Sequence, residues 1–365
     1  MKPFRFRQIL AIAAGLAFAR LLVFEILTPR KLSDALCQWD CGWYLSIIGQ
    51  GYDAAPHLVD GWWQANWAFF PLYPLLVRYL DALTGIDPKP MGMLLSTACF
   101  VAFAALGARY RQITHGEASP WTWLLFVFAW PFGFYFHALY TESLYAALAT
   151  AALLALARDK PLAAGIATAF LGATRPTGML LAAWIGLDGL WKARSAGSLA
   201  QAMRLLLPAA IAPLGLVAFM VFLYFRAGDP LAFQHIQAGW QRTGGNPLTV
   251  LADALGKFDP ANPRLGPFYL VGWAVAGLAA SVWLLFRRRF AEAWFCGLSV
   301  LMALSSGSVF SIPRYVSASP VFLLVVGDIV VSIRRPGLRY GLLLGMAALQ
   351  VVLALFWFRG AAFLG

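Results

Sequence analysis

Long apolar runs, separated by short polar segments, dominate the sequence. A helix needs about 20 consecutive apolar residues to cross the hydrocarbon core of a bilayer. Runs that reach or approach this length lie at 8–27, 91–108, 120–139, 143–157, 162–174, 178–191, 205–225, 267–286, 290–307, 316–333 and 340–358. The pattern predicts an all-α polytopic membrane protein with about 11 transmembrane helices (10–12) in a single integral-membrane domain, residues 1–365.

The segment 66–84 is ambiguous, because it is apolar but contains two prolines, an arginine and an aspartate. If it does not cross the membrane, the basic clusters between the runs all lie on one side: Lys2/Arg5/Arg7, Arg109/Arg111, Arg158/Lys160, Lys192/Arg194/Arg204, Arg287/Arg288/Arg289 and Arg334/Arg335/Arg339. Short cytoplasmic loops carry such an excess of Lys and Arg. We therefore expect 66–84 to be an interfacial or re-entrant helix, the N-terminus to be cytoplasmic, and the long loops 28–90 and 226–266 to face outward.

The runs 162–174 and 178–191 are too short for ordinary spans, because 13 or 14 helical residues extend only about 20 Å. The intervening segment holds Arg175, Pro176 and Thr177. We expect two half-length helices that meet at this break. Such breaks are tolerated at membrane depth where the backbone is buried in protein or lines a wet cavity, so the break points to a site.

The N-terminal stretch 1–27 resembles a signal peptide, since basic residues precede an apolar run. The run continues to membrane-spanning length, and further spans follow it. We expect an uncleaved first helix.

Composition excludes several classes of protein. Hydrophobic residues make up 61% of the chain and charged residues 12%, whereas a soluble domain carries about 25% charged residues. The net charge of +12 is dispersed between apolar runs, as expected of loops that face anionic lipid rather than nucleic acid. The sequence contains no Walker A motif, no HExxH, no paired CxxC and no Asp-x-Asp. The sequence therefore gives no evidence of a required cofactor or of metal ligands, although it is compatible with a bound divalent cation. We expect that an enzyme with this sequence would not use a nucleotide-bound substrate.

The candidate chemistry is concentrated near helix breaks on the expected outer face. Asp40 lies between Trp39 and the pair Trp43 and Tyr44, just after the first span. This pattern has two interpretations: an interfacial aromatic belt with a solvated carboxylate, or an aromatic pocket that tunes a general base.

Cys37 and Cys41 are four residues apart. In a helix the two sulfurs would point along the axis and strain a disulfide. We therefore interpret them as two small packing residues. Cys99 and Cys296 lie inside expected spans and are interpreted as inert.

Glu142, Arg175 and Arg314 each lie at the expected outer end of a span, and Tyr315 follows Arg314. Ionisable residues near membrane depth are costly and mark functional sites by default. An arginine fork binds two phosphate oxygens at once. The alternative is mutual ion pairing, for example between Glu142 and Arg175. His137 and His235 are further candidate hydrogen-bond donors.

The ordered motifs resemble a known family. Residues 39–47 (WDCGWYLSI), followed by Gly51-Tyr52 and by 68–74 (AFFPLYP), are similar to the bacterial relatives of the second mannosyltransferase of GPI-anchor assembly, the PIG-V-like family. Later motifs follow in order: 140–143 (YTES), 174–178 (TRPTG), 237–242 (QAGWQR) and 313–315 (PRY). The resemblance covers nearly the whole chain and departs at Cys41, where these relatives often have glycine.

The resemblance implies a GT-C glycosyltransferase of the plasma membrane, which takes a sugar, mannose in this family, from a polyprenyl-phosphate carrier at the outer face. It places the catalytic base at Asp40. We expect inverting transfer to a lipid, glycan or protein acceptor. The expected roles are: phosphate binding for Arg175, Arg314 and Arg242; orientation of Asp40 or sugar binding for Asp53 and Glu142; stacking on substrate for Trp39, Trp43 and Tyr44; and substrate contacts for His137 and Tyr315.

A transporter or flippase of lipid-linked sugars is the alternative function. It would share the broken helix and the buried arginines, but it predicts an internal repeat with corresponding interruptions, which the sequence lacks. A purely structural membrane subunit explains neither feature. An outer cavity that joins Asp40 to Arg175 and Arg314 would favour the enzyme.

Overall fold

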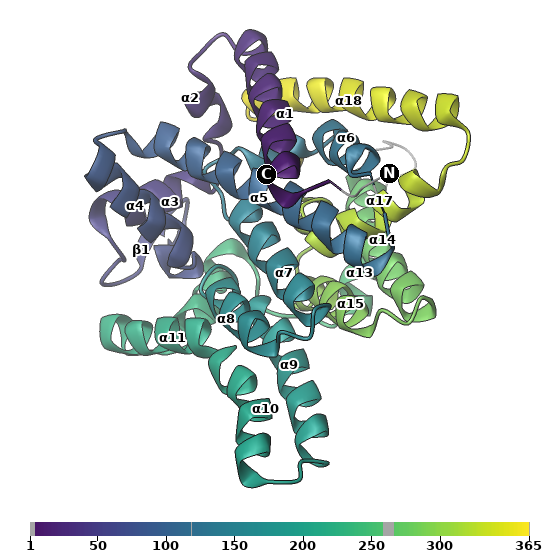
Figure 1. Ribbon diagram of the computed structural model, residues 1–365. Helices are drawn as coiled ribbons and strands as arrows, with labels where there is room; N and C mark the ends of the chain where they lie inside the picture. Colours follow the sequence, from purple (N-terminus) through teal and green to yellow (C-terminus); the bar gives the residue numbers. More distant parts are fainter. Residues whose placement is uncertain (1–3, 118, 258–265, 365) are drawn as a thin grey trace.

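The computed structural model describes residues 4–117, 119–257 and 266–364 and is almost entirely helical (Figure 1). Four helices of the described residues are long and apolar enough to cross a membrane: α1 (Phe6–Leu27), α5 (Pro88–Thr114), α14 (Gly266–Phe286) and α18 (Pro336–Phe358). Helices α10 (Leu199–Ile211) and α11 (Leu214–Ala227) together form a further apolar element that is bent by 50°. These five elements match expected apolar runs.

Five of the six other expected spans are shorter helices. They are α7 (Glu142–Leu156), α8 (Pro161–Gly172), α9 (Gly178–Ala193), α15 (Phe290–Leu304) and α17 (Pro320–Ser332). The predicted break is confirmed, because α8 ends at Gly172 and α9 begins at Gly178. In Figure 1, α9 and α10 form a hairpin that projects from one end of the bundle.

The run 120–139 is not one helix. Helix α6 covers only Trp121–Ala129, and a single 3₁₀ turn, η2 (Gly133–Phe136), follows it. Pro131 lies between them, and proline cannot supply the backbone hydrogen bond that would continue the helix. The chain then reaches α7 through a buried turn at residues 137–141, which brings Glu142 to the start of a helix.

The first long loop folds into small elements beside the bundle. These are α2 (Leu32–Leu36), α3 (Cys41–Gln50), the antiparallel hairpin β1 (His57–Val59) and β2 (Trp62–Gln64), η1 (Asn66–Ala68) and α4 (Leu72–Thr84). Helix α4 buries Tyr73 and Val77, while Leu75, Tyr79 and Leu83 on the opposite face are exposed. Its 13 residues extend only about 20 Å, which agrees with a helix that lies along the interface.

The second long loop covers the same side of the molecule. It contains α12 (Ala232–His235), η3 (Ile236–Trp240) and α13 (Pro247–Gly256). The Gln64 side chain donates a hydrogen bond of 2.9 Å to the carbonyl oxygen of Gly239, so β2 and η3 are joined. Part of the expected loop 226–266, residues 258–265, lies outside the described residues. A last short helix, α16 (Ile312–Ser317), and the terminal turn η4 (Ala362–Leu364) complete the fold.

Glycines allow close packing around the break. A Cβ atom on Gly215 of α11 would lie 1.8 Å from the carbonyl oxygen of Ala169 in α8, and one on Gly165 of α8 would lie 2.7 Å from that of Pro208 in α10. Helices α10 and α11 therefore press directly against α8 and hold its end, where Arg175 follows.

Two arginines that the charge pattern assigned to loops are instead largely buried. Arg111, in the last turn of α5, pairs with Glu117 and with Asp328 of α17, and Arg289 lies 2.9 Å from the second oxygen of Asp328. Arg289 also lies 3.1 Å from Glu292. This cluster ties α5, α15 and α17 together at one end of the bundle.

Candidate active site

A cavity of about 680 Å³ lies where the two long loops meet the bundle. Its apolar wall includes Phe69, Phe233, Trp240 and Phe322. Its polar wall contains eight of the candidate residues identified from the sequence: Asp40, Tyr44, Glu142, Arg175, His235, Arg242, Arg314 and Tyr315. The structure thus joins Asp40 to Arg175 and Arg314 in one cavity.

Acids and arginines alternate along one wall. The Nη2 atom of Arg314 lies 2.6 Å from Oδ2 of Asp40, and its Nε atom lies 3.6 Å from Oε1 of Glu142. Arg175 forms an ion pair with the same oxygen of Glu142. The mutual ion pairing that the sequence offered as an alternative therefore exists, but it involves four residues rather than two and extends to Asp40.

The two paired arginines carry permanent charge. Burial acts to lower the pKa of Arg314, but the carboxylates of Asp40 and Glu142 outweigh it and raise that pKa well above its usual value. The same opposition, with Glu142 as the main partner, raises the pKa of Arg175. The Arg314 side chain is only 6% exposed and that of Glu142 1%, whereas that of Asp40 is 30% exposed. Asp40 is therefore the carboxylate of this set that a substrate reaches most readily.

Arg242 is the uncompensated cation of the cavity. It donates hydrogen bonds to the side chains of Gln237, at 3.1 Å, and Ser311, at 2.8 Å, and it has no acidic partner among the described residues. Two neutral oxygens leave its charge unbalanced. Arg242 follows η3, so the second long loop supplies a positive charge to the cavity.

The pKa of Tyr315 reflects the positive charge of the nearby arginines. The guanidinium carbons of Arg175 and Arg314 each lie 5.5 Å from the centre of its ring. Burial acts to raise the pKa of Tyr315, yet the charges of Arg242, Arg314 and Arg175 outweigh burial and lower it. A region where three arginines favour an anionic phenolate also suits a phosphate.

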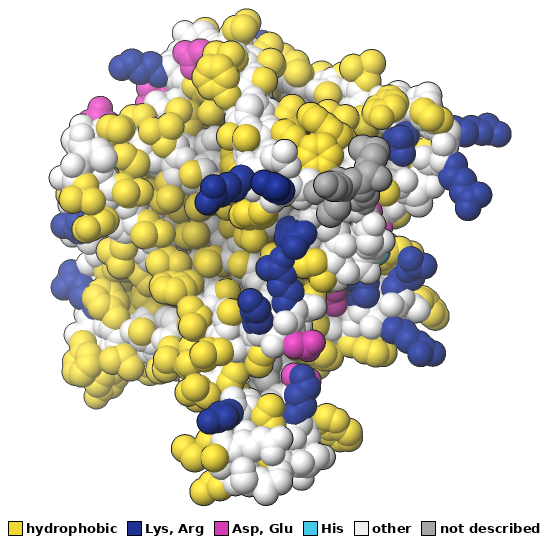
Figure 2. All heavy atoms as spheres, in the orientation of Figure 1, with side chains coloured by type: hydrophobic (Ala, Val, Ile, Leu, Met, Phe, Trp, Pro, Cys, Tyr) yellow, Lys and Arg dark blue, Asp and Glu magenta, His cyan; other side chains and the backbone are white. Residues whose placement is uncertain are grey.

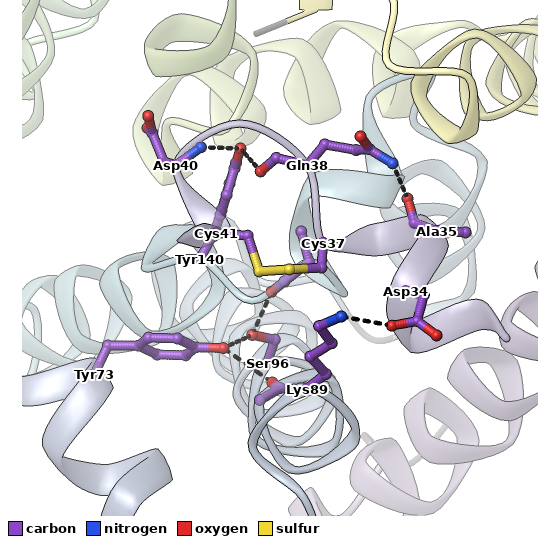
Figure 3. The surroundings of a disulfide bond; sticks show 12 residues. Asp34, Ala35, Cys37, Gln38, Asp40, Cys41, Tyr73, Lys89, Ser96 and Tyr140 are labelled. Atoms are coloured by element: carbon purple, nitrogen blue, oxygen red, sulfur yellow. Dashed lines mark hydrogen bonds and ion pairs between the residues drawn. A yellow bond between two sulfur atoms is a disulfide. The ribbon is translucent and has the colours of Figure 1, made fainter. Parts of the chain in front are cut away.

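The loop that carries Asp40 is held by Tyr140 (Figure 3). The Tyr140 hydroxyl accepts a hydrogen bond of 3.3 Å from the backbone N–H of Asp40 and donates one of 2.8 Å to the carbonyl oxygen of Gln38. Burial raises the pKa of Tyr140, so its hydroxyl keeps the proton that it donates. Arg314 also lies over the Tyr140 ring, at 5.0 Å from its centre.

The interpretation of Cys37 and Cys41 as two packing residues is wrong, because they form a disulfide bond with Cα atoms 5.2 Å apart (Figure 3). The argument against the bond assumed one continuous helix. Instead α2 ends at Leu36 and α3 begins at Cys41, with Trp39 at a positive φ of 46° between them. The chain reverses there, so the disulfide closes a short turn that contains Asp40.

Asp53 and Trp43 contact residues near the cavity but do not line it. Asp53 accepts a hydrogen bond of 2.8 Å from the backbone N–H of Asn66, whose side chain in turn accepts one of 3.0 Å from the N–H of Asp53. Trp43 stacks on Phe69 with ring centres 5.8 Å apart and contacts Trp240 at 5.4 Å.

Trp39 and His137 lie away from the cavity. Trp39 is 46% exposed on the surface. His137 is fully buried: its Nε2 accepts a hydrogen bond of 2.9 Å from Arg20, and its Nδ1 lies 2.8 Å from the hydroxyl of Thr97. The structure therefore places His137 in the packing between α1 and α5.

Further polar residues, to which the sequence analysis gave no role, lie at or beside the cavity wall. Thr141 accepts a hydrogen bond of 2.7 Å from Nε of Arg175, and Thr177 donates one of 2.9 Å to the hydroxyl of Tyr145. Tyr145 and Ser299 line the cavity. Tyr145 lies three residues after Glu142, on the same face of α7, so helical spacing from Glu142 was a signal that could have identified it.

The described residues contain no group of three or more His, Cys, Asp and Glu side chains that could hold a metal ion. The two carboxylates of the wall are instead bridged by Arg314.

No protein-family model matches the sequence, and no curated protein is similar to it by sequence. Solved structures do share its fold. ArnT from Cupriavidus metallidurans bound to undecaprenyl phosphate matches with a TM-score of 0.54 at 14% identity, over 93% of this chain and 63% of ArnT. The apo oligosaccharyltransferase of Archaeoglobus fulgidus matches with a TM-score of 0.51 at 13% identity, over 98% of this chain and 56% of that enzyme. The chain thus spans less than two thirds of either protein, and the expected GT-C-like polytopic fold is confirmed.

Proposed function

We propose that the protein is a membrane glycosyltransferase that transfers a sugar from a polyprenyl-phosphate donor to a hydroxyl acceptor. The observation that carries this proposal is the single cavity in which an accessible carboxylate, Asp40, lies beside Arg175, Arg242 and Arg314. A base and a set of fixed cations are the two elements that transfer from a phosphate leaving group requires. The shared fold supports the same conclusion, because ArnT was solved with undecaprenyl phosphate.

In the proposed reaction, an acceptor hydroxyl attacks the anomeric carbon while Asp40 takes its proton. The new C–O bond forms as the bond between the anomeric carbon and the phosphate oxygen breaks, and the polyprenyl phosphate leaves with that electron pair. One displacement inverts the anomeric configuration. No acid is needed to protonate the leaving group, because the phosphate carries the charge and the arginines stabilise it.

Arg314 serves both halves of this reaction. A guanidinium has five N–H donors, and the contact with Asp40 uses only Nη2. The same side chain is thus able to orient the base and bind a phosphate oxygen. Arg242 has no acidic partner among the described residues, so its positive charge is available to bind the phosphate.

The apolar wall suits the rest of the donor. Phe69, Phe233 and Phe322 offer surface to a prenyl chain, and Trp240 and Tyr44 offer rings on which a sugar stacks. Mannose is proposed as the donor sugar from the family resemblance of the sequence motifs. A lipid, glycan or protein is proposed as the acceptor, and the outer face of a bacterial plasma membrane as the location.

The test is incubation of the purified protein with polyprenyl-phosphate mannose, and separately with its glucose analogue, in the presence of a membrane extract. Mass spectrometry of the products is expected to show one added hexose and released polyprenyl phosphate. The Asp40→Asn protein is the matched control. Transbilayer movement of the donor in proteoliposomes, without any transfer product, would instead favour the transporter.

A further inference from the structure

A second cavity, of about 570 Å³, lies at the other end of α7 from the catalytic wall. Glu142 begins α7 at the active site, and Leu154 and Arg158 line the second cavity about 20 Å away along the helix. Arg5, which precedes α1, and Arg109, in α5, line the same cavity. The two cavities therefore belong to opposite ends of the bundle.

The charged lining of this cavity consists of arginines alone. Arg5, Arg109 and Arg158 contribute to it, and no aspartate or glutamate does. Among the described residues, none of the three has an ion-pair partner, and Arg109 is held only by the side-chain oxygen of Gln112, at 2.9 Å. Figure 2 shows basic side chains gathered in the middle of one face, over the region where α1, α5 and α7 meet in Figure 1. Three unpaired arginines around one hollow attract an anion.

The remaining lining is apolar. Phe4, Phe6, Leu106 and Leu154 form it, and Phe6 is 39% exposed. Because α1 and α5 are both of bilayer length, their ends lie at the depth of lipid headgroups. A soluble anion would gain nothing from this wall, whereas an acyl chain would bury against it.

We propose that this cavity binds an anionic phospholipid, with its phosphate among the three arginines and an acyl chain along the apolar wall. Basic pockets between membrane helices on the cytoplasmic side bind such headgroups. Each arginine near an anionic lipid surface strengthens binding roughly fivefold, so the three together account for about 100-fold.

The experiment compares retention of phosphatidylglycerol and phosphatidylcholine by the full chain, using native mass spectrometry of protein released from mixed vesicles. The test variant is Arg5→Gln/Arg109→Gln/Arg158→Gln. The matched control removes the same charge from three exposed arginines outside the cavity, Arg204→Gln/Arg334→Gln/Arg335→Gln. Wild type and control are expected to retain phosphatidylglycerol preferentially, and the test variant is expected to lose that preference.

The single variant Arg158→Gln, at an exposed position after α7, keeps the test decisive if the triple variant does not fold. It is expected to weaken phosphatidylglycerol retention roughly fivefold. Equal retention of both lipids by wild type would overturn the proposal. So would a control that loses the preference as fully as the test variant, since the effect would then be one of overall charge.

Discussion

Arg314 and Asp40 form an ion pair, with Nη2 of Arg314 2.6 Å from Oδ2 of Asp40, although they come from opposite ends of the chain. The disulfide turn before α3 supplies the carboxylate, and α16 supplies the arginine. The pair fixes the orientation of the proposed base. It also places the positive charge of Arg314 next to the carboxylate that would accept the proton.

Asp40→Asn is expected to abolish transfer while leaving the protein folded. Asparagine keeps the size and polarity of the side chain but does not accept a proton, and general bases contribute about 10²–10⁴-fold in rate. Turnover and melting temperature are measured together. Asp34→Asn is the control, because it removes another carboxylate of the same loop that pairs with Lys89 on the surface. Activity of Asp40→Asn within about threefold of wild type, well short of a general base's usual contribution, would remove Asp40 from the mechanism.

Arg314→Lys is expected to lower kcat/KM roughly 10–100-fold, since lysine keeps the charge but loses the fork that contacts Asp40 and a phosphate together. Arg314→Ala is expected to lower the free energy of unfolding by about 3 kcal/mol as well, because it leaves the buried Glu142 with one partner fewer.

Donor affinity, turnover and melting temperature of both Arg314 variants separate binding from folding. If Arg314→Lys binds and turns over the donor normally while Arg314→Ala melts early, this arginine holds the fold and not the substrate.

Arg242→Gln is expected to raise the KM for the donor roughly tenfold, the size of one charge-assisted hydrogen bond. The melting temperature is expected to stay unchanged, because the partners of Arg242, Gln237 and Ser311, are neutral. Arg242→Lys serves as the control and is expected to recover part of the affinity. An unchanged KM with a lowered melting temperature would show that Arg242 stabilises the contact between η3 and α16 and does not bind the donor.

Removal of the disulfide by Cys37→Ala/Cys41→Ala is expected to lower turnover more than donor binding. The bond closes the turn that carries Asp40, and a disulfide over so short a loop contributes about 2 kcal/mol. Steady-state measurements of kcat and KM, together with a melting curve, test this prediction. Cys99→Ala is the control, since Cys99 is a free thiol outside the cavity. A variant with unchanged kcat would show that Tyr140 alone suffices to hold the turn.

The helical elements and the break were predictable because they depend on local properties of the chain. Run length predicts α1, α5, α14 and α18, and the short runs on either side of Arg175 predict the ends of α8 and α9. The prediction of one span at 120–139 was wrong, because the sequence stays apolar past Pro131 whereas α6 ends at Ala129.

The features that escaped prediction depend on backbone conformation or on distant partners. Nothing in the local pattern shows that Trp39 adopts a positive φ, and that conformation brings Cys37 to Cys41. His137 looked like a site residue until its partner Arg20, far away in sequence, placed it in the core. For the same reason, the pairing of Asp40 with Arg314 required the fold, although both residues were identified individually.

The last prediction is that α4 does not cross the membrane. Leu75, Tyr79 and Leu83 form one exposed apolar face suited to lie on lipid, while Tyr73 and Val77 on the opposite face are buried against the molecule. Single cysteines at Asp87, before α5, and at Lys160, after α7, are both at exposed positions, whereas Arg111 is too buried to probe. The background carries Cys99→Ala and Cys296→Ala and keeps the disulfide, whose sulfurs do not react with a maleimide. An impermeant maleimide added outside intact cells is expected to label position 87 and not 160. The reverse pattern would place position 87, and with it the cavity that joins Asp40 to Glu142 and Arg175, on the cytoplasmic side, and would end the proposal of an outer-face reaction.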